Sequence, residues 1–248
     1  FPTRRSSDLG ENYFYLHQHI GGEVHTEQAD ICIESDFPWN GSVRVRISGT
    51  KKPYTIALRI PGWCEHFEGT LLAEGNEVRI SGSAVEFRSI PDAADDGVCV
   101  EERDGYLYFK KVWIDGDEIR LNFPMEVQIL EADSRIRETS GKVALARGPI
   151  VYCMEEADNG KDLHLLGIDA QKVIDDKSIS VSDSDIAGTF IKKLSVPGQR
   201  KAPVYIDGGK PYRMVRRVEY TPQTLQFVPY YTWANRGENE MRVWVENI

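Results

Sequence analysis

The sequence predicts an all-β protein built from two consecutive antiparallel β-sandwich domains of jelly-roll-like type. Apolar and polar residues alternate with a period of two in many short segments, and turn residues separate these segments. No run of a dozen residues shows the apolar spacing of an amphipathic helix. Because a typical domain holds about 100 to 200 residues, the 248 residues of this chain suffice for two such domains.

The first domain is assigned to residues 10–125. SVRVRIS (42–48) and YTIALRI (54–60) show its pattern best, since β-branched residues alternate there with polar ones. Strands are predicted at 13–20, 29–35, 42–48, 54–60, 76–81, 84–90, 105–113 and 117–123. The breaks are turn sequences, among them Trp39-Asn40-Gly41, Glu74-Gly75-Asn76, Arg103-Asp104-Gly105 and Asp115-Gly116-Asp117.

The second domain is assigned to residues 126–248. Strands are predicted at 125–132, 142–156, 163–168, 178–183, 188–196, 216–222, 225–231 and 239–247. Residues 196–213 are interpreted as a long connection or an edge hairpin. Residues 1–9, FPTRRSSDL, resemble the translation of a sequencing adapter, so this segment is predicted to be artefactual or disordered.

Composition excludes several function classes. The formal net charge is −9 and the isoelectric point is about 5.2, which argues against binding to nucleic acid or an anionic membrane. No stretch of 18 or more apolar residues predicts a transmembrane helix. The four cysteines, Cys32, Cys64, Cys99 and Cys153, form no C-x-x-C pair, so we expect no metal site and a reducing, cytoplasmic location.

The stretch IVYCMEEADN (150–159) raises the question of a nucleophile beside an acid. Negative charge at Glu155 and Glu156 would raise the pKa of the Cys153 thiol, and the composition is that of a buried strand. Cys153 is therefore predicted to be structural. Glu155, Glu156, Asp158 and Asn159 are predicted to form a solvated turn, as are Asp92, Asp95 and Asp96 elsewhere.

Two further groups of residues carry candidate chemistry. His17 and His19 would face the same side of a strand, but neither Glu23 nor His25 is fixed as a third metal ligand. Aromatic rings at Trp39, Trp63, Trp113, Tyr230, Tyr231 and Trp233 either fill cores or stack on sugar rings. The candidate substrate-binding residues are Tyr230, Tyr231 and Trp233, and no catalytic or metal-ligating residue is assigned.

Five blocks in a fixed order point to a known family. They are FPWNG (37–41), LRIPGW (58–63), GYLYFKKVWIDGDEIRLNFPM (105–125), GKVALARGPIVYCMEEADN (141–159) and PYYTWANRGENEMRVW (229–244). With this order and spacing, residues 12–248 resemble the C-terminal half of a β-L-arabinofuranosidase of glycoside hydrolase family 127. No single block would suffice for this assignment.

The resemblance implies that a catalytic (α/α)6 barrel precedes the β-domains in the parent protein. In the family that barrel carries zinc and a nucleophilic cysteine in a Cys-Cys-x-Pro-Asn motif. This chain contains no Cys-Cys pair, so no catalytic residue is carried over and the chain is expected to be inactive and to bind no cofactor. In the resemblance Cys153 belongs to the second sandwich, and Arg147-Gly148-Pro149 is a strand break at which the glycine allows a bulge.

The resemblance therefore predicts an accessory, non-catalytic pair of β-sandwiches of a glycoside hydrolase that acts on plant glycans. Its partner would be the barrel of the same protein, and an apolar patch would be exposed in the isolated chain. The alternatives are a free-standing carbohydrate-binding module, a structural β-sandwich protein without sugar contacts, and an enzyme with an unrecognised site.

Overall fold

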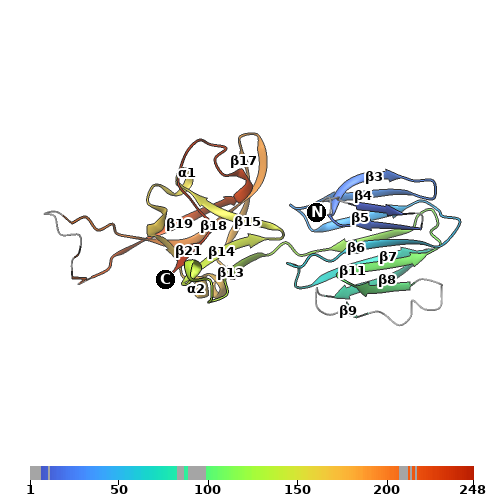
Figure 1. The fold of residues 1–248 in the computed structure, drawn as a ribbon, viewed down its shortest axis with the longest axis horizontal. Helices are drawn as coiled ribbons and strands as arrows, with labels where there is room; N and C mark the ends of the chain where they lie inside the picture. The colour runs from blue at the N-terminus through green and yellow to red at the C-terminus, as the bar shows by residue number, and fades with distance from the viewer. Residues whose placement is uncertain are drawn as a thin grey trace. The chain divides into compact units, whose positions relative to one another are not determined.

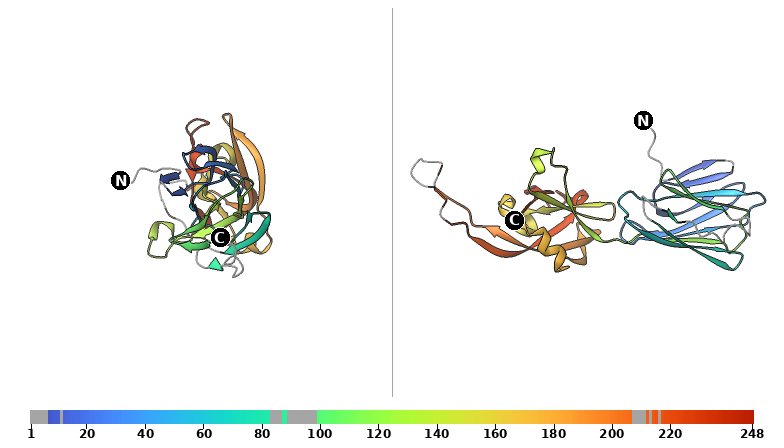
Figure 2. Two further views of the ribbon diagram at one scale, coloured as in Figure 1. Left: turned by 90° about the vertical axis from the view of Figure 1, so that its right-hand side faces the viewer. Right: turned by 90° about the horizontal axis from the view of Figure 1, so that it is seen from below.

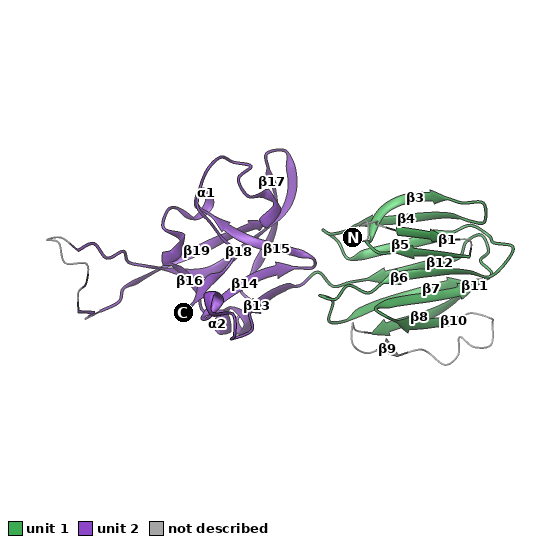
Figure 3. Cartoon of the chain, in the orientation of Figure 1, with its two compact units in different colours: residues 1–125 green, residues 126–248 purple. Residues whose placement is uncertain are grey.

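The structure is a computed structural model that describes residues 7–10, 12–82, 87–88, 99–206, 212, 214–215 and 217–248. The chain divides into two compact units, Phe1–Met125 and Glu126–Ile248 (Figure 3). This division coincides with the boundary predicted after residue 125. The prediction of an all-β fold is confirmed, because the described part of the chain contains just two short α-helices, α1 (Glu156–Asn159) and α2 (Ala170–Asp175). None of the described helices has the length and apolar character needed to cross a membrane.

Unit 1 contains two sheets. The five-stranded sheet has the order β1-β2-β6-β11-β10, in which only β2 and β6 pair in parallel. Its strands are β1 (Ser7–Gly10), β2 (Tyr13–Leu16), β6 (Tyr54–Arg59), β10 (Cys99–Arg103) and β11 (Tyr106–Lys111). Strand β1 shows that Ser7 to Leu9, predicted to be artefactual or disordered, pair with β2. The artefactual origin of residues 1–9 stays a prediction. Residues 1–6 lie outside the described residues.

The second sheet of unit 1 has seven strands in the order β3-β4-β5-β12-β7-β8-β9. They are β3 (Ile20–His25), β4 (Asp30–Asp36), β5 (Ser42–Ile47), β7 (Phe67–Ala73), β8 (Asn76–Gly82), β9 (Phe87–Arg88) and β12 (Glu118–Asn122). Strand β7 was not predicted, since FEGTLLA shows no clear period of two. It pairs with β12, which is nearly 50 positions away, and so completes the middle of the sheet.

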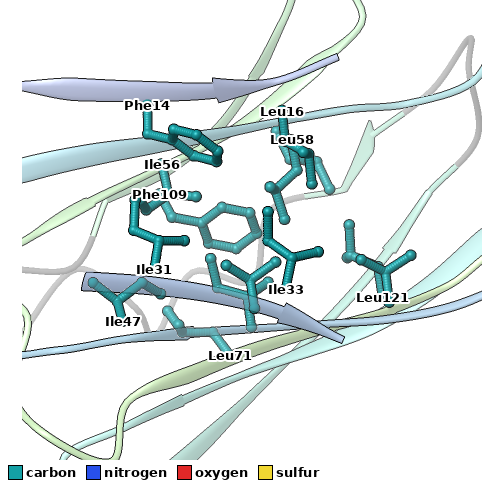
Figure 4. Packing of buried hydrophobic residues seen from close by; sticks show 14 of the residues in the cluster. Phe14, Leu16, Ile31, Ile33, Ile47, Ile56, Leu58, Leu71, Phe109 and Leu121 are labelled. Carbon is teal, nitrogen blue, oxygen red and sulfur yellow. The ribbon is translucent and has the colours of Figure 1, made fainter. Parts of the chain in front are cut away.

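The core of unit 1 lies between the two sheets. Phe14, Leu16, Ile56, Leu58 and Phe109 point inward from the five-stranded sheet, and Ile31, Ile33, Ile47, Leu71 and Leu121 point inward from the seven-stranded sheet (Figure 4). Alternation along each strand produces this arrangement, because successive side chains point to opposite faces. Each fully buried large side chain stabilises the unit by about 1.5–3 kcal/mol relative to an exposed one.

Unit 2 is one nine-stranded sheet. Its strands are β13 (Val127–Glu131), β14 (Lys142–Arg147), β15 (Ile150–Glu155), β16 (Leu166–Ile168), β17 (Ser180–Ile186), β18 (Thr189–Lys201), β19 (Tyr220–Pro229), β20 (Met241–Arg242) and β21 (Val245–Asn247). Six of them pair in the order β14-β21-β16-β18-β19-β15, and β15 pairs again with β14. The sheet therefore closes on itself around its apolar side chains, and closure leaves fewer strand edges exposed.

Two sequence-based assignments in unit 2 need correction. Gly148 and Pro149 form the two-residue turn of the β14–β15 hairpin, with φ of +56° at Gly148, and not a bulge within a strand. Residues 196–213 are interpreted as a long connection or an edge hairpin, and the connection is wrong for residues 196–201. These residues continue β18, whose residues 194–201 pair with β19 in an antiparallel hairpin. These two strands lie side by side in Figure 1, and the right-hand view of Figure 2 shows the same orange and red strands together.

Candidate functional site

The candidate aromatic site follows strand β19, where the strand gives way to a single 3-10 turn, η4 (Tyr230–Thr232). Pro229 ends the strand, because proline has no N–H to donate to a further ladder bond. The fully buried Thr232 donates its hydroxyl hydrogen to the carbonyl oxygen of Pro229 at 2.7 Å. The backbone N–H of Trp233 donates to the carbonyl of Tyr230 at 3.1 Å, so the turn has a fixed shape.

This turn brings two of the three predicted aromatic residues together. The rings of Tyr230 and Trp233 are nearly parallel, with an interplanar angle of 18° and a centroid separation of 6.4 Å. Tyr230 is 46% exposed and Trp233 is 43% exposed. Tyr231 is also exposed, but it is not part of this stacked pair. Two near-parallel rings open to solvent can present their faces to the C–H groups of a flat ligand.

The segment that follows Trp233 is held by a buried carboxylate on the neighbouring strand. Strand β15 pairs with β19 (Figure 1). It ends at Glu155, whose side chain is fully buried. Glu155 accepts a hydrogen bond from the backbone N–H of Ala234 at 3.2 Å and an ionic hydrogen bond from Arg236. The same Arg236 nitrogen donates to Asp158 at 2.6 Å, and Lys193 donates to Asp158 at 3.0 Å.

The prediction of a solvated turn at residues 155–159 is therefore wrong for most of its members. Glu155 and Asn159 are buried, and the side chain of Asp158 is only 11% exposed. Arg236 and Lys193 compensate the buried negative charge. Arg236 lies 81 positions from Glu155, and Lys193 lies 35 positions from Asp158. No local sequence signal could have identified these partners, since only the strand pairing brings them together.

Electrostatics within this cluster follow from the ion pairs. Burial alone would raise the pKa of Asp158, but hydrogen bonds from Arg236 and Lys193 bring that pKa below its usual value. The pKa of Arg236 is raised, chiefly by its hydrogen bond to Asp158. Both groups are therefore charged at neutral pH, and the cluster is a positioning element for the Trp233 segment.

Asn159 fixes the helical turn α1 against β19. Its side-chain amide donates to the carbonyls of Glu155 at 3.0 Å and Gln226 at 2.9 Å, and its side-chain oxygen accepts from the N–H of Gln226 at 2.8 Å. These bonds occupy the side-chain oxygen and both amide hydrogens that an asparagine offers. Asn159 is thus a structural residue, and its oxygen is already used inside the protein.

Two of the described cysteines, Cys64 and Cys153, do not have the properties of nucleophiles. Cys153 is fully buried, and burial together with Glu155 raises the pKa of its thiol to about 12. Burial raises the pKa of the Cys64 thiol to about 11, and this thiol donates to the carbonyl of His66. Cys32 accepts a weak hydrogen bond from Arg46, and all three are free thiols. The side chain of Cys99 lies outside the described part of the structure.

The two histidines predicted to share a strand face are separated. Strand β2 ends at Leu16, and the chain bends before His19. His17 bonds to Tyr106 and Asp8, whereas His19 is buried beside Phe123 and binds the carbonyl of Arg59 at 2.8 Å. Burial lowers the pKa of His19 to about 4.

A metal centre is not found in the part of the chain that the structure describes. No group of three or more His, Cys, Asp or Glu side chains is placed there to hold a metal ion. The thiols also do not fit a zinc site, since a zinc ligand is a thiolate and burial keeps Cys64 and Cys153 protonated. The acidic residues Asp92, Asp95 and Asp96 lie outside the described residues.

Two further tryptophans of the candidate set, Trp63 and Trp113, serve packing. Trp113 is fully buried, and its indole N–H donates to the carbonyl of Tyr54 at 2.8 Å. Trp63 packs against the core of unit 1, with its ring stacked on Phe37 at a centroid distance of 6.3 Å. For these two residues the structure agrees with packing in a core, which was one of the two roles predicted for the aromatic residues.

Comparison with protein families gives one match for each unit. Residues 13–125 match the model of the "Beta-L-arabinofuranosidase, GH127 middle domain", and residues 127–246 match the model of the "Glycoside hydrolase family 127 C-terminal domain". A curated relative, the non-reducing end β-L-arabinofuranosidase of Bifidobacterium longum subsp. longum, is 33% identical over 219 residues. The aligned region covers 84% of this chain but 29% of that relative, so the chain spans less than a third of its length.

Solved structures give the same result for the fold. A β-L-arabinofuranosidase of family 127 from Geobacillus stearothermophilus is similar with a TM-score of 0.77 and 31% identity, covering 97% of this chain and 34% of that one. A second structure, that of a glycoside hydrolase, has a TM-score of 0.75 and 26% identity, covering 97% of this chain and 37% of that one. In both, the similarity extends over the two units described above.

Proposed function

Since this chain belongs to glycoside hydrolase family 127, we propose that it supplies the accessory β-domains of an enzyme that releases terminal L-arabinofuranose, with retention, from plant-derived glycans. The observation that carries the proposal is the pair of family matches, which together cover residues 13–125 and 127–246. The named activity of the bifidobacterial relative supports the choice of sugar. The proposed activity is that of the whole parent protein.

The chain itself is proposed to be non-catalytic. The resemblance places the nucleophile of the parent in a Cys-Cys-x-Pro-Asn motif, which this sequence lacks. The buried Cys153, with its thiol pKa of about 12, is unsuited to attack a sugar because the thiolate is the reactive form. Zinc and the thiolate chemistry are accordingly assigned to the catalytic domain of the parent.

The proposed partner is that catalytic domain, an (α/α)6 barrel in the same protein. The length of the relatives supports this, since the chain covers about a third of each structure. Exposed apolar side chains also support a docking role. They concentrate in the connection between β18 and β19 and at the start of β19, at Val204, Tyr205, Tyr212, Met214, Val215, Val218 and Tyr220.

Hydrolysis of an aryl L-arabinofuranoside tests the proposal. We expect no hydrolysis by this chain above the rate of buffer alone. Hydrolysis that disappears in the Cys153→Ser variant would show a free-standing enzyme and overturn the proposal. Sequencing the source DNA upstream of the Gly10 codon is the complementary test. An in-frame continuation that encodes Cys-Cys-x-Pro-Asn is expected, whereas a stop codon followed by a genuine start would contradict the parent enzyme.

The second candidate function is carbohydrate binding by unit 2. The observation that favours it is the half-exposed, near-parallel pair of Tyr230 and Trp233. Titration with neutral arabino-oligosaccharides at millimolar concentration should change tryptophan fluorescence, and Trp233→Ala should remove that change. Tyr231→Ala is the comparison variant, because it removes an exposed aromatic ring from the same turn and leaves Tyr230 and Trp233 in place. Absence of any fluorescence change would remove this candidate.

The free thiols of Cys32, Cys64 and Cys153 support the predicted reducing, cytoplasmic compartment. Among the described residues, these three cysteines form no disulfide in either unit. The compartment itself stays a prediction. Fractionation of the source cells with an antibody against this chain measures it directly, and recovery in an oxidising compartment would contradict it.

A further inference from the structure

The outer face of the seven-stranded sheet in unit 1 is hollowed. A groove of about 920 Å³ lies over strands β4, β5, β12, β7 and β8. This volume is at the upper end of the range of small-molecule sites, about 300–1,000 Å³. All of the residues that line the groove belong to unit 1.

Strand register places two rows of polar side chains across the groove. Residues directly opposite one another in adjacent strands project from the same face of a sheet. The first row crosses five strands and consists of Glu34, Arg44, Arg120, Thr70 and Arg79. The second row crosses four strands and consists of Ser42, Asn122, Glu68 and Ser81. All nine residues line the groove.

The centre of the first row contains two arginines in direct opposition. Arg44 and Arg120 are cross-strand partners, and like charges in that position repel. The buried carboxylate of Glu118 offsets this repulsion, because it binds both Arg120 and Arg44, the latter at 3.4 Å. Glu34 also binds Arg44, at 3.3 Å. Side chains held in this way lose less conformational entropy when a ligand binds.

The charges of the groove point to the chemical class of the ligand. Four carboxylates line it, from Glu34, Asp36, Glu68 and Glu77, against three guanidinium groups, from Arg44, Arg79 and Arg120. The balance of one negative charge gives no attraction for an anion. Guanidinium donors, carboxylate acceptors, amides and hydroxyls alternate at short range, which suits ligand hydroxyls because each of them donates one hydrogen bond and accepts others.

From this geometry we propose that the groove on unit 1 binds a neutral oligosaccharide. Among the residues that the structure describes, the lining of the groove includes no aromatic ring, so recognition is by hydrogen bonding across the two rows. This inference rests on unit 1 alone and goes beyond the proposed function. It gives the β-domain pair a role in holding a glycan chain, whichever sugar the parent enzyme removes.

The test is isothermal titration calorimetry of the whole chain with neutral xylo- and arabino-oligosaccharides, with oligogalacturonides as the acidic comparison. The double variant Glu68→Ala/Arg79→Ala removes one group from each row and leaves the net charge unchanged. Among the described residues, the ion pair of Arg79 is the one with Glu77 at 3.7 Å, a weak exposed contact, so the loss of Arg79 should not disturb the fold. The matched control is Arg217→Ala/Glu219→Ala, which removes an exposed pair in unit 2 at the same net charge.

We expect binding of a neutral oligosaccharide that weakens about tenfold in the groove variant, since each charge-assisted hydrogen bond contributes enough for such a change. The control variant and Trp233→Ala should bind the oligosaccharide as tightly as the unsubstituted chain does. Ser81→Trp, which fills the groove from its edge, should also abolish binding if the groove is the site.

Three results would overturn the proposal. They are absence of heat with every neutral oligosaccharide, a preference for the oligogalacturonide, and binding that Trp233→Ala removes while both groove variants retain it. The last result would support the aromatic pair of unit 2 instead. The absence of arabinofuranosidase activity affects none of these outcomes, so failure of the groove and failure of the proposed function are distinguishable.

Discussion

Arg236 binds the fully buried carboxylate of Glu155, which lies 81 positions earlier in the chain. Through the same nitrogen it reaches Asp158, so one guanidinium compensates two acids on adjoining elements. Because Glu155 also accepts the N–H of Ala234, the ion pair determines where the segment after Trp233 runs. The candidate aromatic site therefore depends on a salt bridge that no sequence pattern indicated.

Replacing Arg236 should destabilise unit 2 and loosen the aromatic pair. Arg236→Ala leaves Glu155 buried without its counter-charge, which costs about 3 kcal/mol of the free energy of unfolding. Urea unfolding, monitored by the hydrogen exchange of backbone amides in β15 and β19, measures this loss. The control is Arg242→Ala, which removes a partly exposed ion pair to Glu246 and should cost less than about 1 kcal/mol. Equal effects of the two variants would contradict the role given to Glu155.

Unit 1 should lose stability as the pH falls from 6.5 to 4, because His19 must take up a proton on unfolding. Burial lowers the pKa of His19 in the folded state to about 4, whereas the unfolded-state pKa is near 6.5. The stability that neutral His19 contributes is therefore fully present above pH 6.5 and is lost progressively between pH 6.5 and pH 4. The expected loss at pH 5 is about 2 kcal/mol. Hydrogen exchange of β6 and β11 at pH 7 and pH 5 measures it.

His19→Gln should flatten that pH dependence, and His66→Gln, at an exposed position in the same unit, should leave it unchanged. A dependence that persists in His19→Gln would assign the effect to other groups. The expected sign follows from burial, which disfavours the charged form of His19 and outweighs the hydrogen bond that Nε2 donates to the carbonyl of Arg59.

Thiol reactivity should follow burial. In a Cys99→Ser background at pH 8, iodoacetamide should modify Cys32 first, because burial raises the thiol pKa of Cys64 to about 11 and that of Cys153 to about 12. Peptide mass spectrometry after timed quenching gives the order. In urea all three should react at similar rates, which is the internal control. Rapid labelling of Cys153 in the folded chain would contradict its structural assignment.

A second buried ion pair should stabilise the turn between β11 and β12. Lys111 and Asp117 are both buried and lie 2.9 Å apart, and Asp117 also accepts the backbone N–H groups of Glu74 and Ile114. Lys111→Met should cost about 3 kcal/mol by leaving the carboxylate without its cation. Lys110→Met, at the adjacent exposed position, should change the unfolding free energy of unit 1 by less than about 0.5 kcal/mol. If Lys111→Met left the unfolding free energy of unit 1 unchanged, the backbone donors alone would satisfy Asp117.

Much of the sheet structure could be predicted because the pattern is local. Val43, Val45 and Ile47 alternate with polar residues, and the structure buries all three. The candidate site could be predicted only in part. Tyr230 and Trp233 were identified by residue type, but their stacking arises from the η4 turn, and the partners of Glu155 come from distant segments.

The groove shows the same limit. Arg44 and Arg120 are ordinary outward positions in two separate strands, and only the register of β5 with β12 makes them neighbours. Strand register depends on which strands pair, and pairing is a property of the folded chain that alternation alone does not specify.

Alternation, turn residues and the order of five blocks are local features of the chain, so the all-β class, the boundary near residue 125 and the family could be predicted without a structure. The closure of unit 2, the burial of Glu155 and the two polar rows of the groove are properties of the folded chain alone. Each of these depends on residues far apart in the sequence, whose charges and hydrogen bonds are balanced only when the strands pair.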